Sequence, residues 1–532
     1  MEQKHVDAVI VGAGFAGLYA THRLRNRQGL SVQCFEAAPG PGGVWFWNRY
    51  PGARCDFESI HYCYTFDEEL QREWRWTERY AAQPEILAYL EHVADRFDLR
   101  RSYRFSTRVT SAVWDDDAAH WVVGTDDGSV ITSRFLINAA GAFSVTKRND
   151  FPGQEVFRGT VLHTSHWPAD GVDLAGKRVA VIGTGSTGIQ VIQTIAGQVA
   201  ELTVFQRSAN FACPLGNRPL SDEEFQQAVE EYPRRREEAR ACVAGAPYPR
   251  AVRPALADTP GERRKVYDQY YNGGGFRMLA STYFDLIFNP VANETAAEYI
   301  RERIRERVQD PEVAELLCPT DHPYGTKRAT FESNYYETFN LPHVRLVDAR
   351  TTPIARITEN GIATTAGQYE FDVIVLATGF ESHAFVAPME VIGASGRTLA
   401  EEWEPVARAY LGLSVPGFPN MFLLYGPNTN GGTGSVIYVI EAGVAHVIAA
   451  LDALQRANAD RIEIRRERAD AFNRELRAAL AGTVWHTGCT NWYVDENGND
   501  PNQWPWMWST YRRRTRHLEP GVYDTARARN RP

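Results

Sequence analysis

Two clusters of glycine residues have the spacing that a dinucleotide-binding turn requires. The first, at 12–17 (GAGFAG), comes directly after the apolar run 8–11 (AVIV) and precedes a helical pattern. Gly12 suits the tight turn, Gly14 lets the backbone approach a pyrophosphate, and Gly17 lets helix and strand pack closely. The helix N-terminus then faces the phosphates with unpaired N–H groups. This order of elements predicts a dinucleotide site; a chance glycine-rich turn is the alternative.

The second cluster (GTGSTG) repeats this spacing with Gly183, Gly185 and Gly188 after another apolar run. The two copies differ at the residue 24 positions beyond the first glycine, which is Glu36 in the first copy and Arg207 in the second. A carboxylate there accepts hydrogen bonds from a ribose diol, whereas an arginine pairs with a 2′-phosphate. The first site therefore suits FAD or NAD and the second suits NADP, unless Arg207 is a surface residue without a ligand.

These turns need strands and helices to hold them, which sets the expected fold. The chain has 532 residues, too many for one compact core, and 44% of them are hydrophobic, as is usual for a globular enzyme. We expect an α/β protein with two Rossmann-like dinucleotide-binding domains, one for FAD and one for NADP, and a helical insertion. The expected limits are 1–145 and 376–532 for the FAD-binding domain, 146–212 and 322–375 for the NADP-binding domain, and 213–321 for the insertion.

Outside the two turns, three segments have recognisable patterns. In the polar, helical insertion, Ser221 and Glu224 have capping-box spacing at the start of one helix, and Asn293 is expected to cap another. Residues 157–168 look like an exposed connector. The segment 44–56 mixes aromatic with charged residues and is predicted to line a cleft, because buried charges need partners. An aromatic packing loop would have the same composition.

Composition and charge argue against several classes of function. The formal net charge is -9 and no basic domain stands out, so nucleic acid is not an expected partner. The longest apolar run, 436–451, is interrupted by Glu441 and His446 and is expected to be a core helix. No membrane span or signal peptide is predicted. The seven cysteines include no Cys-x-x-Cys pair, which favours a reduced cytoplasmic protein without a metal cluster.

The connector carries a more specific motif, in which Phe157, Gly159, His163 and Trp167 stand at fixed spacing. It resembles the fingerprint of type I Baeyer–Villiger monooxygenases, because related flavin-containing and N-hydroxylating monooxygenases usually carry Tyr or Phe at the tryptophan position. Three further segments resemble the same family in the same order, namely 42–56, 325–328 and 377–380. Together with the two glycine motifs, the resemblance extends to about residue 425.

The resemblance implies FAD and NADPH as cofactors, with a small-molecule ketone and O2 as the substrates. In that family NADPH reduces FAD, oxygen adds to flavin carbon C4a, and the resulting peroxyflavin attacks the ketone carbonyl to give an ester or lactone. Arg328 matches the catalytic arginine of the family, and Asp56 matches the carboxylate that orients it. Since the pKa of an arginine exceeds about 12, Arg328 would act through its charge and not as an acid.

The resemblance also assigns cofactor contacts and a coupling role. Arg207 and Lys327 match residues that hold the 2′-phosphate. The other predicted cofactor contacts are Gly43, Trp45, Asp56 and Ser208, in addition to Glu36 and the six motif glycines named above. His163 and Trp167 match residues that couple NADP binding to domain movement, and they are not expected to touch the substrate.

Two other functions stay open at this point. A flavin monooxygenase that oxidises sulfur or nitrogen shares the same plan, but it needs the flavin hydroperoxide, beside which an arginine is unhelpful. A non-catalytic NADPH-sensing protein would bind the nucleotide without consuming oxygen. The loop 426–435 and the Trp-rich segment 485–511 resemble members that act on aryl ketones, and the Trp-rich segment either caps a pocket or belongs to the core. The particular ketone, the selectivity and the oligomeric state are not predicted.

Overall fold

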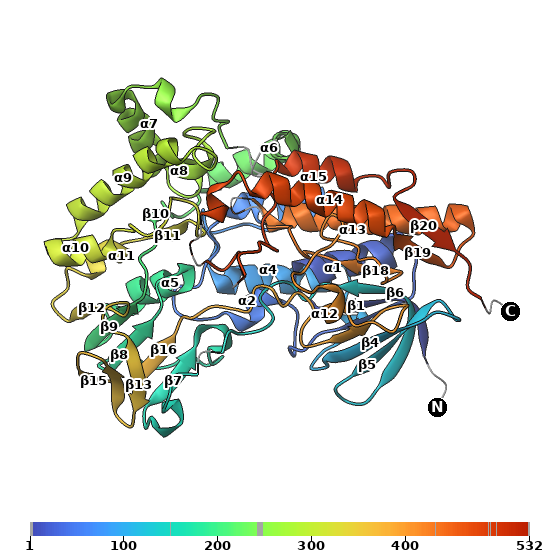
Figure 1. The fold of residues 1–532 in the computed structure, drawn as a ribbon, viewed down its shortest axis with the longest axis horizontal. Coiled ribbons are helices and arrows are strands. Elements are labelled where there is room, and N and C mark those ends of the chain that lie inside the picture. The colour runs from blue at the N-terminus through green and yellow to red at the C-terminus, as the bar shows by residue number, and fades with distance from the viewer. Residues whose placement is uncertain are drawn as a thin grey trace.

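A computed structural model of the chain describes residues 4–148, 150–241, 248–430, 432, 434–487, 489, 491–495 and 497–529. Predictions that cover Cys242, Gly431, Thr433, Gly488, Thr490 and Glu496 lie outside the described residues. Two large sheets lie in two lobes, and helices lie along one side of both (Figure 1). The architecture is the α/β class that the two glycine motifs predict.

The first sheet has eight strands in the order β17-β4-β5-β6-β1-β2-β3, with β18 paired to β6. Their bounds are β1 His5–Val11, β2 Val32–Phe35, β3 Tyr103–Arg104, β4 Val109–Asp115, β5 His120–Thr125, β6 Val130–Asn138, β17 Glu390–Ile392 and β18 Met421–Leu423. Strand β1 lies between β2 and β6, parallel to both, and Ala8, Val9 and Ile10 are fully buried. A strand buried on both faces has a continuous apolar sequence, which made β1 easy to predict.

The second sheet consists of five parallel strands in the order β12-β9-β8-β16-β7. They are β7 Thr160–His163, β8 Arg178–Ile182, β9 Glu201–Gln206, β12 Val344–Asp348 and β16 Val373–Leu376. Strand β7 corrects the prediction of an exposed connector, because this segment adds the edge strand and Trp167, just beyond it, is only 5% exposed. Strand β7 has the sequence TVLH, with only two apolar residues, and so lacks the continuous apolar run that marks the buried strands.

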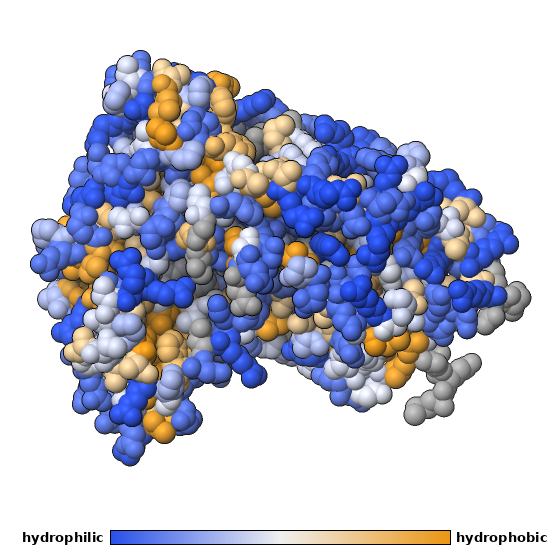
Figure 2. All heavy atoms as spheres, in the orientation of Figure 1, coloured by the Kyte–Doolittle hydropathy of each residue, from blue (hydrophilic) through white to orange (hydrophobic). Residues whose placement is uncertain are grey.

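Helices from distant parts of the chain pack around the first sheet. They are α1 Phe15–Thr21, α4 Gln83–Arg96, α13 Val436–Ala457, α14 Arg466–Leu480 and α15 Trp508–Thr515. The helix after the first glycine motif changes to a π-helical turn, η1, at His22–Arg27. In Figure 2 the region over α14 and α15 is covered mainly by hydrophilic residues. Helix α13 lies beneath them and contacts both α1 and α15.

Helix α13 is the predicted core helix. Among the described residues it alone is long and apolar enough to cross a membrane by length and composition, and more than half of its most apolar stretch is buried inside the protein. Glu441 and His446, which interrupt the apolar run, both have partners: the half-buried Glu441 accepts hydrogen bonds from Thr65, and the buried His446 contacts Tyr523. The helix therefore serves as packing for the first lobe.

The insertion is helical, as predicted, with α6 Asp222–Ala241, α7 Pro260–Gly273, α8 Arg277–Ala280, α9 Pro290–Arg307 and α10 Pro311–Leu317. The capping box at α6 is confirmed, since Ser221 and Glu224 each bond to the other's backbone N–H. The prediction that Asn293 caps a helix is wrong. Asn289 caps α9, and Pro290 occupies its first turn. Asn293 lies within the helix, and its side chain is buried.

Short elements complete the chain. They are the strand pairs β10 Ala212–Pro214 with β11 Thr330–Glu332 and β19 Arg461–Ile464 with β20 Tyr523–Ala526, the sheet of β13 Ile354–Thr358, β14 Gly361–Thr364 and β15 Gln368–Glu370, and the helices α2 Val44–Trp47, α3 Glu68–Glu73, α5 Ser186–Ile195, α11 Tyr335–Thr338 and α12 Leu399–Glu402. Strand β16 ends at Leu376, beside the expected limit between the two dinucleotide-binding domains. The domain limits themselves stay a prediction.

Candidate active site

A cavity of ≈ 1860 Å³ lies between the two lobes and is lined by residues of both glycine motifs. The turn from β1 to α1 and the turn from β8 to α5 both open into it, together with the segment 44–56 and the start of α13. The expectation that the aromatic and charged segment 44–56 lines a cleft is therefore confirmed. A cavity of this size between two such turns is large enough for two dinucleotides.

The first glycine motif leaves no room for side chains where the strand meets the helix. Gly12 has a φ of +108°, and a Cβ there would lie 2.5 Å from the carbonyl oxygen of Ala139. A Cβ at Gly17 would lie 1.8 Å from the carbonyl oxygen of Gly12. Gly14 and Gly43 instead face each other at the cavity wall. This bare stretch of backbone fits the pyrophosphate of a flavin dinucleotide.

Glu36 follows the end of β2 and is 7% exposed at the cavity wall. Its two carboxylate oxygens accept hydrogen bonds from the backbone N–H groups of Ala13 and Ala38, each at 2.7 Å. Burial raises the pKa of Glu36, although these N–H donors oppose the shift. A carboxylate has about four acceptor positions, so Glu36 retains capacity for a ribose diol. The residues present therefore fit the adenosine half of FAD.

The second motif has the same geometry as the first. Gly183 has a φ of +110°, and a Cβ there would lie 2.5 Å from the carbonyl oxygen of Ala377. A Cβ at Gly188 would lie 2.1 Å from the carbonyl oxygen of Gly183, whereas Gly185 has open space on the cavity side. Two glycines thus serve packing in each motif, and the middle one is left for a ligand.

Positive charge gathers at the end of β9, beside the second motif. Arg207 is exposed at the cavity and forms no ion pair with any residue that the structure describes. Lys327 donates a hydrogen bond to Ser208, whose hydroxyl donates to Asp321 at 2.7 Å. This group fits the 2′-phosphate of NADP. Asp321 was not predicted, because nothing in the sequence marks an acid that lies 113 residues from its serine partner.

Arg328 and Asp56 form a bidentate pair at the cavity. Nη2 of Arg328 lies 2.9 and 3.0 Å from the two oxygens of Asp56, and Nε lies 3.2 Å from Oδ2. Nη1 donates to the carbonyl oxygen of Gly432 at 3.3 Å, and the guanidinium lies 5.2 Å from the ring centre of Phe276. Burial opposes the charge of Arg328, but Asp56 outweighs it and raises the pKa of Arg328 above its usual value.

The fingerprint motif lies behind the cavity wall. Nδ1 of His163 accepts a hydrogen bond from the backbone N–H of Ser165 at 3.2 Å, and its Nε2 lies 3.2 Å from the hydroxyl of Thr378. Burial lowers the pKa of His163 to about 4. None of Phe157, Gly159, His163 and Trp167 is among the residues that line the cavity. A Cβ at Gly159 would lie 2.4 Å from the carbonyl oxygen of Asp372, so packing explains that glycine.

The cavity wall also contains residues that were not predicted individually, such as Tyr62 and Gln190. Trp45, a predicted contact, donates its indole N–H to the hydroxyl of Tyr62 at 3.2 Å, and both line the cavity. Tyr50 donates to Gln190 of α5 at 2.9 Å and so joins the two lobes. In the sequence, the aromatic residues among them were marked only by the aromatic composition of their segment, and Gln190 was not marked at all.

The Trp-rich tail is divided between the two predicted roles. Trp485 and Trp492 line the cavity, whereas Trp504 and Trp508 are buried in the core at 2% and 3% exposure. Among the residues that the structure describes, no group of three His, Cys, Asp or Glu side chains is placed to hold a metal ion.

Comparison with known proteins adds a family to this geometry. Residues 10–75 match the family model of an NAD(P)-binding Rossmann-like domain. A Baeyer–Villiger monooxygenase of Pseudooceanicola batsensis is 41% identical over 425 residues, which are 79% of this chain and 77% of the relative. A phenazine N-monooxygenase of Lysobacter antibioticus is 38% identical over 499 residues, or 93% of this chain and 91% of the relative.

Solved structures agree with these relatives over the whole fold. A steroid monooxygenase bound to NADP has a TM-score of 0.93 and 44% identity, with 99% of this chain and 100% of that chain covered. A cyclohexanone monooxygenase from Rhodococcus sp. Phi1 bound to NADP+ has a TM-score of 0.94 and 36% identity at the same coverage.

Two dinucleotide-binding folds that face one cavity indicate a two-cofactor flavoprotein, and the relatives that match this chain are monooxygenases. The chain belongs to the Baeyer–Villiger monooxygenase family, and it is an FAD- and NADPH-dependent enzyme of that kind. The predicted fold class, the cofactors and the reaction class are thereby confirmed, and the NADPH-sensing alternative is set aside.

Proposed function

We propose that this enzyme inserts one oxygen atom of O2 beside the carbonyl group of a small-molecule ketone and releases an ester or a lactone. The observation that carries the proposal is the Arg328–Asp56 pair, which lies in the cavity that both dinucleotide turns open into. A fixed cation is the group this reaction needs, because negative charge develops on the ketone oxygen before the carbon–carbon bond migrates.

FAD, reduced by NADPH, supplies the activated oxygen when it is bound. The chain's own contribution is electrostatic. Arg328 remains charged throughout, since burial does not overcome Asp56, and it stabilises the oxyanion without giving up a proton. Asp56 accepts hydrogen bonds from both Nε and Nη2 of the guanidinium, which fixes its direction. Losing one such donor costs about 3–4 kcal/mol of transition-state stabilisation, or on the order of 10²–10³ in rate.

Twelve of the other predicted site residues have a proposed part in holding a cofactor. Gly12, Gly14, Gly17, Glu36, Gly43 and Trp45 would hold FAD, and Gly183, Gly185, Gly188, Arg207, Ser208 and Lys327 would hold NADPH. Lys327 would act as a point charge and Arg207 as a planar fork on the 2′-phosphate. The guanidinium of Arg207 is exposed and forms no ion pair with the described part of the chain, which supports this assignment.

The connector has a proposed coupling role. His163 bonds to Thr378, which lies in the segment that returns from the second sheet to the first. Phe157, Gly159 and Trp167 flank His163 in the sequence, and a shift of the NADP lobe would reach the FAD lobe through this motif. The cytoplasm is the proposed location, in keeping with the burial of α13.

N-oxygenation is the second candidate, because the Lysobacter antibioticus relative that spans 93% of this chain is named a phenazine N-monooxygenase. The Arg328–Asp56 pair favours the ketone, since a cation beside the flavin holds the oxygenating group as an anion, whereas transfer to nitrogen or sulfur needs the protonated form.

A product panel separates the candidates. The enzyme would be incubated with NADPH, O2 and cyclic, linear and aryl ketones, in parallel with sulfides, amines and a phenazine. We expect an ester or lactone from at least one ketone class. Products confined to sulfoxides or N-oxides would reject the ketone proposal.

A further inference from the structure

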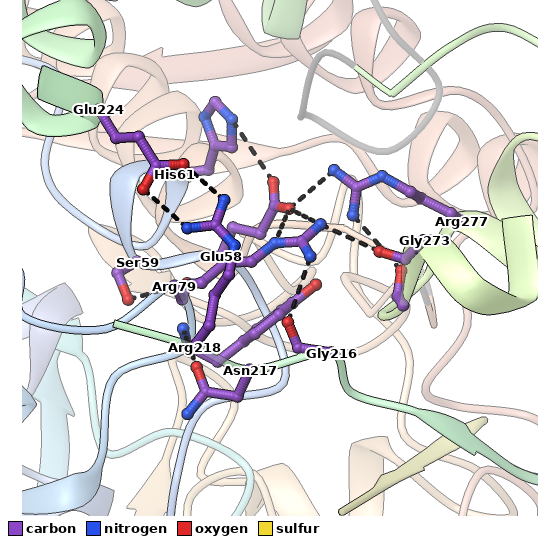
Figure 3. A network of polar contacts seen from close by, with 12 residues as sticks. Glu58, Ser59, His61, Arg79, Gly216, Asn217, Arg218, Glu224, Gly273 and Arg277 are labelled. Carbon is purple, nitrogen blue, oxygen red and sulfur yellow. Dashed lines mark hydrogen bonds and ion pairs between the residues drawn. The ribbon is translucent and has the colours of Figure 1, made fainter. Parts of the chain in front are cut away.

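Arg328 lies between Asp56 and Phe276, and residues next to these two in the chain also contact each other. Asp56 bonds to the guanidinium on one side, and the ring of Phe276 packs against it on the other. Two residues after Asp56 comes Glu58, and directly after Phe276 comes Arg277. These two neighbours form an ion pair, with Nη2 of Arg277 2.7 Å from Oε1 of Glu58. Figure 3 shows this pair at the centre of a wider polar network.

Glu58 is a buried carboxylate with two arginine partners, Arg277 and Arg79. Its side chain is only 8% exposed, and its Oε1 also accepts hydrogen bonds from Nε and Nη2 of Arg79 at 3.0 and 2.9 Å. His61 lies 4.0 Å away. Burial alone would raise the pKa of Glu58, but Arg277 and its other cationic neighbours outweigh burial and lower it. Glu58 is therefore charged at neutral pH.

The network joins the insertion to the FAD lobe. Arg79 donates to the carbonyl oxygens of Gly216 and Gly273, at 3.2 and 3.1 Å, and both glycines lie in or beside the insertion. The guanidinium of Arg277 lies 5.1 Å from the ring centre of Tyr248. Figure 3 shows Arg79 and Arg277 meeting at Glu58, with Gly216 and Gly273 beside Arg79.

Phe57 lies between Asp56 and Glu58 in the chain, and its ring packs against two aromatic rings of the insertion. Its ring centre lies 6.2 Å from that of Phe276 and 6.1 Å from that of Tyr248. Three consecutive residues, 56 to 58, thus contact Arg328, Phe276 and Arg277 in turn. The segments 56–58 and 276–277 thus contact each other, with Arg328 at one end and the Glu58–Arg277 ion pair at the other. The distance between Asp56 and Phe276 therefore depends on that ion pair.

We propose that Glu58 and Arg277 are positioning residues for Arg328: their ion pair sets the gap between Asp56 and Phe276, and so the direction of the guanidinium. The inference rests on the proposed function of Arg328. Neither residue lines the cavity, so neither touches a cofactor or a substrate there. A misplacement of about 1 Å at a reacting centre costs on the order of 10²-fold in rate. Breaking the pair therefore lowers oxygen transfer while leaving flavin reduction intact.

The test separates oxygen transfer from flavin reduction in Glu58→Gln. When transfer fails, the NADPH and O2 consumed leave as NADP+ and hydrogen peroxide, so the ester-to-peroxide ratio reports the geometry of Arg328. We expect this ratio to fall at least tenfold, with the anaerobic rate of flavin reduction by NADPH within twofold of the wild type. The KM for the ketone should change less than kcat.

A matched control is Glu402→Gln. Glu402 is also a buried carboxylate, 3% exposed, with three arginine partners, Arg397, Arg408 and Arg466, but it lies in α12, outside the cavity. We expect its ester-to-peroxide ratio to stay at the wild-type value. Arg277→Gln leaves Glu58 paired with Arg79 and serves as the second variant if Glu58→Gln does not retain FAD. Arg277→Lys, which keeps the charge, should restore part of the ratio.

Three results would overturn the proposal. The first is full ester formation in both Glu58→Gln and Arg277→Gln. The second is an equal loss in Glu402→Gln, which would mark a general loss of stability. The third is a parallel loss of flavin reduction. A wild-type enzyme that forms no ester from any ketone would instead reject the proposed function, so the two failures can be told apart.

Discussion

At the scale of single residues, we propose that the charge at the end of one strand in each lobe selects the nucleotide. Glu36 and Arg207 occupy equivalent places after β2 and β9, and their opposite charges were visible from the spacing of the two motifs. Glu36 is already tied to two backbone N–H groups, whereas Arg207 extends into the cavity without an ion pair among the described residues. We propose that the Arg207 guanidinium is the part of the second site that distinguishes NADPH from NADH.

Replacing this guanidinium should affect one cofactor and not the other. In Arg207→Ala we expect the KM for NADPH to rise about 10- to 100-fold, since a hydrogen bond to a charged group contributes about 1.5–3 kcal/mol. The KM for NADH should change less than twofold. Steady-state oxygen consumption with each cofactor measures both values, and equal increases for the two would mean that Arg207 does not contact the phosphate.

Partners far apart in the chain limited what could be predicted at this scale. Arg328 and Asp56 are 272 residues apart, and only the family resemblance paired them. Phe276 and Gly432, which complete the surroundings of Arg328, had no signal at all, because an aromatic ring or a glycine carbonyl has no distinctive spacing. The ion pair of Glu58 with Arg277 was invisible for the same reason.

At the scale of elements, the strand–turn–helix units were predictable because their geometry requires glycine at fixed positions. The positive φ angles of Gly12 and Gly183 and the close approach at Gly17 and Gly188 are consequences of packing a helix directly onto a strand. Short or irregular elements were not predictable. Strand β7 has only four residues, and the start of α9 is set by Pro290 instead of the asparagine three positions later.

The second motif offers a pair of substitutions that separates folding from binding. A Cβ in Gly188→Ala would lie 2.1 Å from the backbone oxygen of Gly183, so β8 and α5 must move apart, at a cost of about 1–3 kcal/mol. Gly185→Ala has nothing within 4 Å and should fold normally, yet its methyl group lies where the pyrophosphate must approach.

Thermal unfolding and the KM for NADPH measure the two effects. We expect a lower Tm in Gly188→Ala, and in Gly185→Ala an unchanged Tm with a KM for NADPH raised about tenfold, the loss of about 1.4 kcal/mol of binding. A Gly185→Ala enzyme with normal KM would show that the backbone there does not approach the cofactor.

At the scale of the whole molecule, stability should depend on buried neutral histidines. Burial lowers the pKa of His61 and of His446 to about 4, against 6.5 when unfolded. Between these values the unfolded chain binds protons that the folded chain does not. Stability is therefore complete above about pH 6.5 and falls as the pH drops towards 4. Asp500, whose pKa burial raises to about 7, acts in the opposite direction over the same range.

His446 allows this dependence to be isolated. Its ring lies between the carbonyl oxygen of Thr515 and the hydroxyl of Tyr523, at 3.1 and 2.7 Å. Charging it costs up to about 3 kcal/mol. In His446→Gln the fall in Tm from pH 6.5 to 4 should be smaller than in the wild type. The control is His517→Gln, at an exposed position, where the fall should be unchanged. Equal pH profiles for all three proteins would contradict the assignment.

The two-lobe plan itself follows from two repeated motifs in one chain, but the way the lobes meet does not. Contacts such as Tyr50 to Gln190 join the FAD segment to α5, and they depend on the relative placement of whole sheets. The cavity that contains Arg328 exists only because of that placement. Sequence patterns describe each lobe separately, so the shape of the substrate pocket lay beyond them.

The central claim is that Arg328 serves oxygen transfer and not flavin reduction. The most direct test is Arg328→Ala, measured in two steps: anaerobic reduction of the flavin by NADPH, then ester formation with oxygen and a ketone that the wild type accepts. We expect reduction at close to the wild-type rate and ester formation lowered by at least 10²–10³-fold. Ester formation at the wild-type rate, or a loss of flavin reduction as large as the loss of ester, would contradict the account.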